Sequence, residues 1–398
     1  MSPTTQPPPR RHAGLAAWTR RDRLAGLAFQ ALLLVALVWG LTALAGNAVA
    51  NLERQGIASG FDFLGRTAGF DISQVLIDYK NTDTYGRAFL VGLLNTLLVA
   101  GLGIVIATVI GFLVGIARLS PNWLVAGLGT SFVEIVRNVP LLLQLFIWYF
   151  AVLKNLPAPR QSIALPLGAL INVRGLYLPR AVWGEGAGLV LAAAGIGLLA
   201  AVVLVARAAR QRRATGTAPR VAPLAVLLGI GLPLVAYLVA GQPLSFTKPE
   251  LKGFNVAGGL AVQPEFVALL AGLSVYTAAF IAEVVRAGIA GVPKGQTEAA
   301  SALGLDRAQT LRLVVIPQAL RIIIPPLTNQ YLNLTKNSSL AVAIGYPDLV
   351  SVFAGTVLHQ TNQAIEVIAI TMAVYLALSL LTALVMGMFN ARYALART

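Results

Sequence analysis

The sequence predicts an all-α polytopic membrane protein with about eight transmembrane helices. Of its 398 residues, 57% are hydrophobic and only 11% are charged, whereas a soluble domain carries about a quarter charged residues. The apolar residues are gathered in runs long enough for a helix of about 20 residues to cross the hydrocarbon layer. Arginine blocks beside these runs follow the positive-inside pattern of membrane proteins.

The composition also limits the kinds of functional site that the chain can contain. The chain has no cysteine and two histidines, which excludes thiolate metal sites and argues against an imidazole cluster. Its net charge of +15 is compatible with nucleic-acid binding, but the basic residues stand beside apolar runs, where they indicate topology. We therefore expect lipid around the chain and no nucleic-acid partner. The two basic blocks are Arg10, Arg11, Arg20, Arg21 and Arg23, and Arg207, Arg210, Arg212, Arg213 and Arg220.

Hydropathy divides the chain into spans and loops. The predicted spans lie near 25–49, 88–116, 134–153, 186–206, 221–240, 264–288, 318–356 and 364–388. The seventh is too long for one straight crossing, and it contains Pro325–Pro326 and Gly345–Pro347. In the second, Gly111 and Gly115 form a small-xxx-small pair that favours close helix packing.

The distribution of charge predicts the orientation. Residues 51–87 have no excess of basic residues, whereas 207–220, 289–317 and the C-terminal tail are basic. The positive-inside rule therefore places both termini in the cytoplasm. We predict a flexible cytoplasmic N-terminus at 1–23, the first transmembrane helix with a periplasmic loop at 24–87, a transmembrane domain at 88–390 and a cytoplasmic tail at 391–398.

One cytoplasmic stretch, residues 293–317, predicts two short helices joined by an elbow. Glu298–Leu303 is rich in alanine and favours helix, and Gly304 supplies the left-handed residue that ends it. Asp306 can then cap the next helix, with Gln309 in capping-box register. Such a knob suits docking in the groove of another protein, or it is an amphipathic loop on lipid headgroups. The residues alone leave both open.

The same stretch resembles the EAA coupling loop of ABC importer permeases. The resemblance consists of Glu298-Ala299-Ala300, Gly304 after three residues, and a conservative ending at Val314-Val315-Ile316-Pro317. Three segments resemble polar-amino-acid uptake permeases, and most closely the general L-amino-acid permeases that are made with two related membrane subunits. They are VEIVRNVPLLLQLFIWYF (133–150), SVYTAAFIAEVVRAGIAGVPKGQTEAASALG (274–304) and PPLTNQYLNLTKNSSLAVAIGYPDL (325–349). The resemblance covers about 88–390.

The resemblance implies a type I ABC importer permease fold in a bacterial inner membrane. Residues 155–263 would be an insertion with two extra helices, and 293–317 would be the coupling loop. The implied partners are a second related permease subunit, two ATPase subunits and a periplasmic amino-acid-binding protein. The chain has no G-x-x-x-x-G-K-[ST] motif, so we expect a non-catalytic subunit without a cofactor, with ATP and Mg on the ATPase. The residues implied to contact the ATPase are Glu298, Ala299, Ala300, Gly304 and Leu305.

A polar face in the seventh span is the candidate substrate path. Asn329, Asn333, Lys336 and Asn337 recur at helical spacing, and a lysine within a span costs about 2.5–3.5 kcal/mol on insertion scales. Such a face should line a pathway, where the lysine could meet the carboxylate of a zwitterionic amino acid. The alternative is structural: Lys336 pairs with Asp348 or forms hydrogen bonds with neighbouring helices. The predicted pathway residues are Asn333, Lys336, Asn337, Ser338 and Ser339.

The resemblance also bears on the charge selectivity of this path. Many relatives have aspartate where this chain has Asn337, and the neutral amide puts a cation-selective site in doubt.

Two pairs of opposite charge stand three residues apart in spans. Glu134 and Arg137 begin the third span, and Glu283 and Arg286 lie near the end of the sixth. At this spacing we expect mutual neutralisation within each helix, with a gate or an interhelical contact as the alternative.

Three classes of function are compatible with these patterns. The first is the permease subunit of an ATP-driven L-amino-acid importer, probed by co-purification of an ATPase chain. The second is an ion-coupled secondary amino-acid transporter, which would call for acidic residues deep within spans. The third, a channel or structural subunit, leaves the Gly304 elbow without a role.

Overall fold

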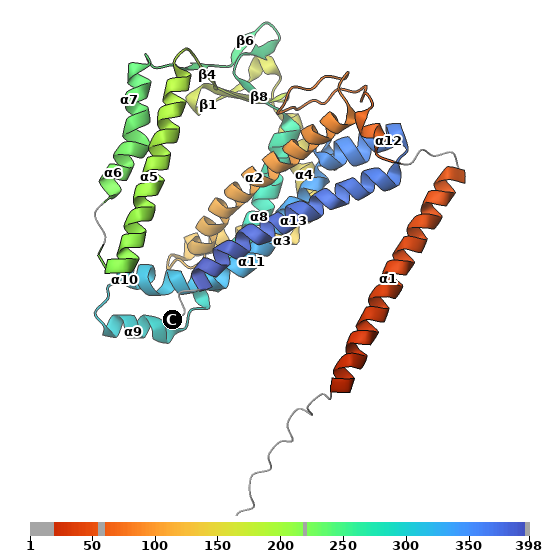
Figure 1. Cartoon of the computed structure of the whole chain (residues 1–398). Helices are drawn as coiled ribbons and strands as arrows, with labels where there is room; N and C mark the ends of the chain where they lie inside the picture. Colours follow the sequence, from red (N-terminus) through yellow and green to blue (C-terminus); the bar gives the residue numbers. More distant parts are fainter. Residues whose placement is uncertain (1–19, 55–59, 218–220, 395–398) are drawn as a thin grey trace, which may run out of the picture.

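The computed structural model describes residues 20–54, 60–217 and 221–394, which form a mostly helical molecule (Figure 1). Within these residues, seven helices are long and apolar enough to cross a membrane, or up to eight if one bent pair is counted as a span. The prediction of about eight spans is therefore confirmed. Most of the predicted N-terminal segment (1–23) and half of the predicted tail (391–398) lie outside the described residues.

The α-helices follow the predicted spans closely, apart from the third and seventh. Their bounds are α1 Arg20–Arg54, α2 Tyr85–Ala117, α3 Trp123–Asn138, α4 Leu141–Phe146, α5 Ala187–Thr215, α6 Ala222–Val226, α7 Leu232–Val239, α8 Pro264–Ala290, α9 Lys294–Ala302, α10 Arg307–Thr310, α11 Ile316–Asn337, α12 Leu358–Thr361 and α13 Ala364–Ala394.

Short β-strands between α4 and α8 were not predicted. They make an antiparallel sheet in the order β1-β2-β3-β8 and two small pairs, β4-β5 and β6-β7. Hydropathy over spans of about 20 residues does not register strands of three or four residues. The strands are β1 Ile163–Leu165, β2 Ala169–Asn172, β3 Gly175–Leu178, β4 Arg180–Trp183, β5 Leu244–Thr247, β6 Glu250–Lys252, β7 Asn255–Ala257 and β8 Leu260–Val262.

The third predicted span, 134–153, is a bent pair of helical segments that begins earlier, at Trp123. Helix α3 ends at Asn138, and the helical segment Leu141–Asn155 leaves it at an angle of 104°. Pro140 has no N–H to continue the helix, and it forces Val139 into extended backbone (φ −102°, ψ 126°). The side-chain amide of Gln144 donates to the carbonyls of Val136 and Val139 at 2.8 and 2.9 Å, which satisfies two acceptors freed by the break.

The seventh span breaks at only one of the two predicted places. Pro325 and Pro326 lie inside α11 without ending it. The chain continues through a 3-10 helix, η8 (Ser338–Ile344), and breaks at Gly345, whose φ of 76° ends the helix in the left-handed region. After a turn, a π-helix, η9 (Val350–Val357), leads into α12. The expected span 318–356 is therefore one membrane helix followed by a separate short helix.

Helices α2 and α8 meet at a closely packed seam, in agreement with the close packing that the small-xxx-small pair predicted. Gly111 faces Ile281, and Gly115 faces the carbonyl of Ala282 and the side chain of Val285. An added Cβ would stand 2.6 Å from Ile281 at the first position and 2.7 Å from the Ala282 oxygen at the second. The two backbones can approach this closely only because both glycines lack a side chain.

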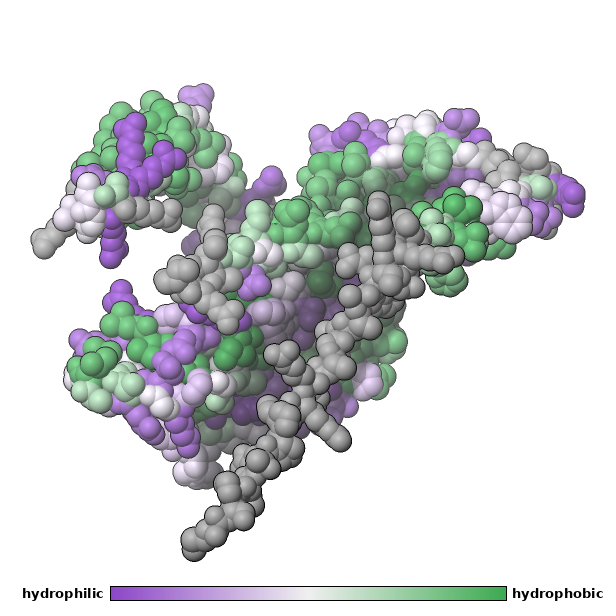
Figure 2. All heavy atoms as spheres, turned by 60° about the horizontal axis from the view of Figure 1, so that its bottom comes forward, coloured by the Kyte–Doolittle hydropathy of each residue, from purple (hydrophilic) through white to green (hydrophobic). Residues whose placement is uncertain are grey.

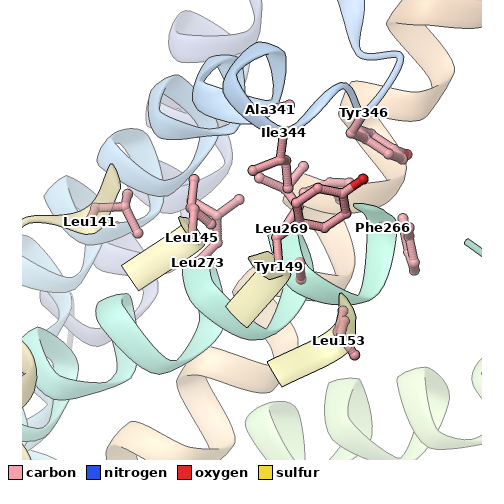
Figure 3. Packing of buried hydrophobic residues seen from close by; sticks show 12 residues of the cluster. Leu141, Leu145, Tyr149, Leu153, Phe266, Leu269, Leu273, Ala341, Ile344 and Tyr346 are labelled. Carbon is pink, nitrogen blue, oxygen red and sulfur yellow. The ribbon is translucent and has the colours of Figure 1, made fainter. Parts of the chain in front are cut away.

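A second buried cluster joins the segment after Pro140 to α8 and η8 (Figure 3). Leu145 and Leu273 are fully buried in it, and Tyr346 closes it at the turn after η8. By contrast, α1 and the hairpin of α5 with α6–α7 stand away from this bundle (Figure 1), and their apolar side chains are mostly exposed. The bundle of α2, α8, α11 and α13 therefore contains the core.

We expect Gly111→Ala to destabilise the protein, because the new methyl group would overlap Ile281. Overpacking of this kind costs about 1–3 kcal/mol, which should lower the melting temperature in detergent. Gly101→Ala on the same helix is the matched control, since nothing lies within 4 Å of its Cβ. An unchanged melting temperature for Gly111→Ala would contradict the close packing of the seam.

Candidate functional site

The predicted polar face lies on α11 and η8, and its residues differ in how exposed they are. Asn333 and Lys336 are exposed, and Asn337 and Ser339 are half-buried. Ser338 is fully buried, and its hydroxyl donates to the carbonyl of Thr335 at 2.7 Å. Four of the five predicted residues are therefore accessible from outside the bundle, and Ser338 is part of its interior.

Lys336 and Asp348 do not form the alternative ion pair. Asp348 is fully buried, and its carboxylate accepts from the backbone N–H of Ser351 at 2.8 Å and from the hydroxyl of Tyr375 at 3.4 Å. It thus satisfies the first turn of η9, as a capping carboxylate does. The ion pairs found within the described residues do not include Lys336, so the structural pairing is wrong.

Lys336 instead stands at a recess between α11, η8, η9 and α13. The recess has a volume of about 430 Å³, which lies in the range of sites for small organic molecules. It combines one ammonium group with hydroxyls and an apolar wall, and Asn333, Asn337 and Ser338 do not line it. Tyr375 and Ser379 were missed because no pattern in the apolar run of α13 marks them. The lining residues are Lys336, Ser339, Val350, Met372, Tyr375, Leu376 and Ser379.

The elbow has the predicted local structure. Gly304 adopts a φ of 77° after α9. Asp306 accepts from the N–H of Gln309 at 2.8 Å, while the Gln309 side chain accepts from the N–H of Asp306 at 3.0 Å. We call α9, the elbow and α10 (residues 294–310) the knob.

The predicted contact residues play two different roles in the knob. Glu298, Ala299 and Gly304 are exposed, whereas Ala300 is buried and the N–H of Leu305 donates to its carbonyl at 3.1 Å. Ala300 and Leu305 therefore hold the elbow together. Figure 2, which brings this end of the molecule forward, shows hydrophobic and hydrophilic residues mixed over it.

The two charge pairs differ in geometry. Glu283 and Arg286 are paired at 2.5 Å, and Arg118, which directly follows α2, also binds the Glu283 carboxylate. The Glu283 carboxylate is therefore neutralised by two arginines, and its bond to Arg118 connects α2 to α8 near the knob. Glu134 and Arg137 form no ion pair within the described residues. The guanidinium carbon of Arg137 lies 5.0 Å from the ring centre of Phe280 instead. The predicted neutralisation at that position is wrong.

Residues 107–395 match the family of binding-protein-dependent transport system inner membrane components. The chain is 55% identical to the putative amino-acid ABC transporter permease protein YhdX of Escherichia coli, over 92% of this chain and 93% of that one. It is 54% identical to the general L-amino acid transport system permease protein AapQ of Rhizobium johnstonii, over 92% of each. It is also 38% identical to the glutamate/glutamine/aspartate/asparagine transport system permease protein BztB of Rhodobacter capsulatus, over 96% and 97%.

These matches agree with the bundle of membrane-spanning helices. A model covering residues 107–395 and relatives aligned over nine-tenths of both chains leave no large part of the bundle unmatched. The chain therefore belongs to the binding-protein-dependent transport system inner membrane components and is a non-catalytic permease subunit of an ABC transporter.

Proposed function

We propose that this permease carries L-amino acids of several kinds into the cell, through a path past Lys336. The observation that carries this proposal is the recess of about 430 Å³ with the ammonium group of Lys336 at its wall, where it forms no ion pair with the residues that the structure describes. A zwitterion needs a cation or N–H donors for its carboxylate, and the ε-ammonium of Lys336 supplies the first. Tyr375, Ser339 and Ser379 supply hydroxyls that orient a polar solute. The names of the similar proteins support amino acids as the substrate class.

The knob is the proposed contact with the ATPase. Glu298 on α9 and Leu303 directly after it are exposed, and the column from Arg307 to Ile344 is continuous enough to count as one span. A displacement of the knob would therefore move the Lys336 face with it. ATP and Mg would bind the ATPase chain, so hydrolysis takes place outside this subunit. The family membership decides against an ion-coupled secondary transporter and against a channel or structural subunit.

The position of the knob sets the proposed orientation of the chain in the membrane. If the ATPase is cytoplasmic, the knob end of the bundle faces the cytoplasm, and the strands face the periplasm. Helix α13 ends on the knob side (Figure 1), in agreement with a cytoplasmic C-terminus. The C-terminal end of α5 also lies on the knob side (Figure 1), and it carries the basic residues Arg207, Arg210 and Arg212, as the positive-inside rule expects for a cytoplasmic end. The binding protein would then deliver substrate to the strand-bearing end.

A second, related permease subunit is the proposed partner within the membrane. Lys336 and Asn333 are exposed on the surface of this chain, and polar groups are costly where they face lipid. A facing permease would cover this surface and enclose the path between two chains. The two ATPase subunits would then bind one knob each.

Gly304→Val should weaken ATPase binding. Because Gly304 has a φ of 77°, a β-branched residue there costs about 1 kcal/mol or more and re-aims the knob. We expect reduced recovery of the ATPase with the purified permease, at an unchanged melting temperature. Gly295→Ala, on α9 with nothing within 4 Å of its Cβ, should retain the ATPase. Full retention in Gly304→Val would refute the assignment of the knob.

Lys336→Met should lower amino-acid uptake by the complex in liposomes. A charge-assisted hydrogen bond contributes about 1.5–3 kcal/mol, so substrate binding in the permease should weaken by roughly ten-fold or more. Stability should not change, because Asp348 is not the partner of Lys336. Lys336→Arg keeps the charge and should keep most of the uptake. Normal uptake in Lys336→Met would remove this residue from the path.

This chain expressed with the ATPase alone should give little transport, since its exposed polar face would lack the related permease that covers it. Adding the second permease should restore uptake in liposomes. An active complex that contains only this permease would show instead that two copies of it suffice.

A further inference from the structure

Residues 60–84 form a strap across the strand-bearing end of the bundle, outside the matched region 107–395. In Figure 1 the strap runs over the ends of the helices between β8 and α12. It has little regular structure apart from one 3-10 turn, Asp62–Gly65. Its position is therefore fixed by contacts with other elements.

Two anchors attach the strap to the first residues of membrane helices. The N–H of Gly60 donates to the carboxylate of Glu366, in the first turn of α13, at 2.8 Å. Gln263, the residue that precedes α8, donates from its side-chain amide to the carbonyl of Ser73 at 2.5 Å. The hydroxyl of Ser73 donates in return to the Gln263 side-chain oxygen at 3.3 Å. The strap thus holds the ends of α8 and α13 together.

The centre of the strap enters the bundle at Gln74. Its side-chain amide donates to the hydroxyl of the buried Tyr346 at 3.2 Å. Its carbonyl accepts from the fully buried amide of Asn95 on α2 at 2.9 Å, and Asn95 also donates to the carbonyl of Pro347 at 2.9 Å. One strap residue therefore joins α2 to the turn that follows η8.

Apolar packing and internal bonds fix the rest of the strap. Phe63 is fully buried, with the rings of Tyr85 and Phe353 at 6.4 and 6.1 Å. Tyr79 donates to the carbonyl of Phe70 at 2.9 Å. Burial, with the carboxylates of Asp83 and Asp71 nearby, raises the pKa of Tyr79 to about 12, so this donor keeps its proton at physiological pH.

These contacts continue to the wall of the recess. The N–H of Asp348 donates to the carbonyl of Tyr346 at 2.9 Å, and the carboxylate of Asp348 accepts from Tyr375, which lines the recess with Lys336. Lys336 is exposed on the flank of this chain, and once a facing permease covers that flank, a solute from the strand-bearing end would have to pass the ends of α2, α8, α13 and the turn after η8. The strap joins all four, so opening a passage between them would break some of its bonds.

We propose that the strap is the gate of the permease at the strand-bearing end. Gln74 and Gln263 are the positioning residues that hold it closed in this structure. Their bonds to Tyr346 and Ser73 break when substrate enters from the binding protein. This inference rests on the proposed function, because it takes the strand-bearing end to be the side from which substrate arrives.

The first test locks the strap to α8. The chain has no cysteine, so Ser73→Cys with Gln263→Cys provides the only two thiols of this subunit. A reducible bifunctional methanethiosulfonate would join them in the full complex in liposomes, with the partner subunits also free of cysteine. Uptake should fall to background and return on reduction, while Ser73→Cys alone, treated identically, should keep its uptake. Unchanged uptake, with the cross-link verified by peptide mass spectrometry, would overturn the proposal.

The second test does not depend on which solute is carried. With Ser339→Cys as the sole thiol in the recess, a membrane-impermeant thiol reagent is added from the side of the strap. Gln74→Ala should raise the labelling rate about two- to ten-fold, the effect of losing one hydrogen bond from the closed state. Val75→Ala, an exposed neighbour, should not. An equal rate in the Gln74→Ala and Val75→Ala variants, at equal melting temperatures, would overturn the gate even if the complex carries no amino acid. Conversely, accelerated labelling without amino-acid uptake would keep the gate and overturn the proposed substrate.

Discussion

The close approach of α2 and α8 is the constraint on which the rest of the bundle depends. Gly111 and Gly115 allow the backbone of α2 to lie against Ile281 and Ala282. Val133 of α3 packs with Ala279 and Ala282 of the same helix, α8. Van der Waals contact between small residues is the main source of helix association in lipid, where the hydrophobic effect does not act between helices. The seam thus sets the positions of the elements that surround it.

The two ends of this seam are secured by polar contacts of different kinds. Near the knob, Arg118 at the end of α2 binds Glu283 of α8, which also pairs with Arg286. At the opposite end, Asn95 of α2 donates to the strap and to the turn after η8. The first contact involves full charges and ties only two helices. The second is a neutral network spread over several elements, which can exchange its hydrogen bonds for others during a conformational change at modest cost.

Both breaks in the membrane helices are compensated by side chains. Gln144 satisfies carbonyls freed at Pro140, and Asp348 caps the helix that follows Gly345. Irregular backbone is tolerated at membrane depth only where protein or a water-filled cavity surrounds it. The break at Gly345 adjoins the recess, and the column from Arg307 to Ile344 joins that recess to the knob. One mechanical element therefore connects the proposed ATPase contact with the proposed substrate path.

The sequence by itself determined the features that depend on local periodicity and on neighbours within a few residues. Long apolar runs defined the spans, because a helix in lipid must satisfy its own backbone. Gly304, Asp306 and Gln309 defined the elbow, because caps act over three residues. Lys336 stood out by its cost within an apolar run. The motifs around these residues also indicated the family, and the comparisons confirmed it.

Only the tertiary structure decided which partners those residues have. Lys336 and Asp348 are twelve positions apart and of opposite charge, yet the turn at Gly345 directs Asp348 into the bundle, towards Tyr375. Arg137 meets Phe280 instead of Glu134, and Arg118 joins Glu283 across 165 positions. The strap likewise contacts residues more than 180 positions away. Such pairings depend on how the helices pack against one another, and no local pattern in the sequence encodes that geometry.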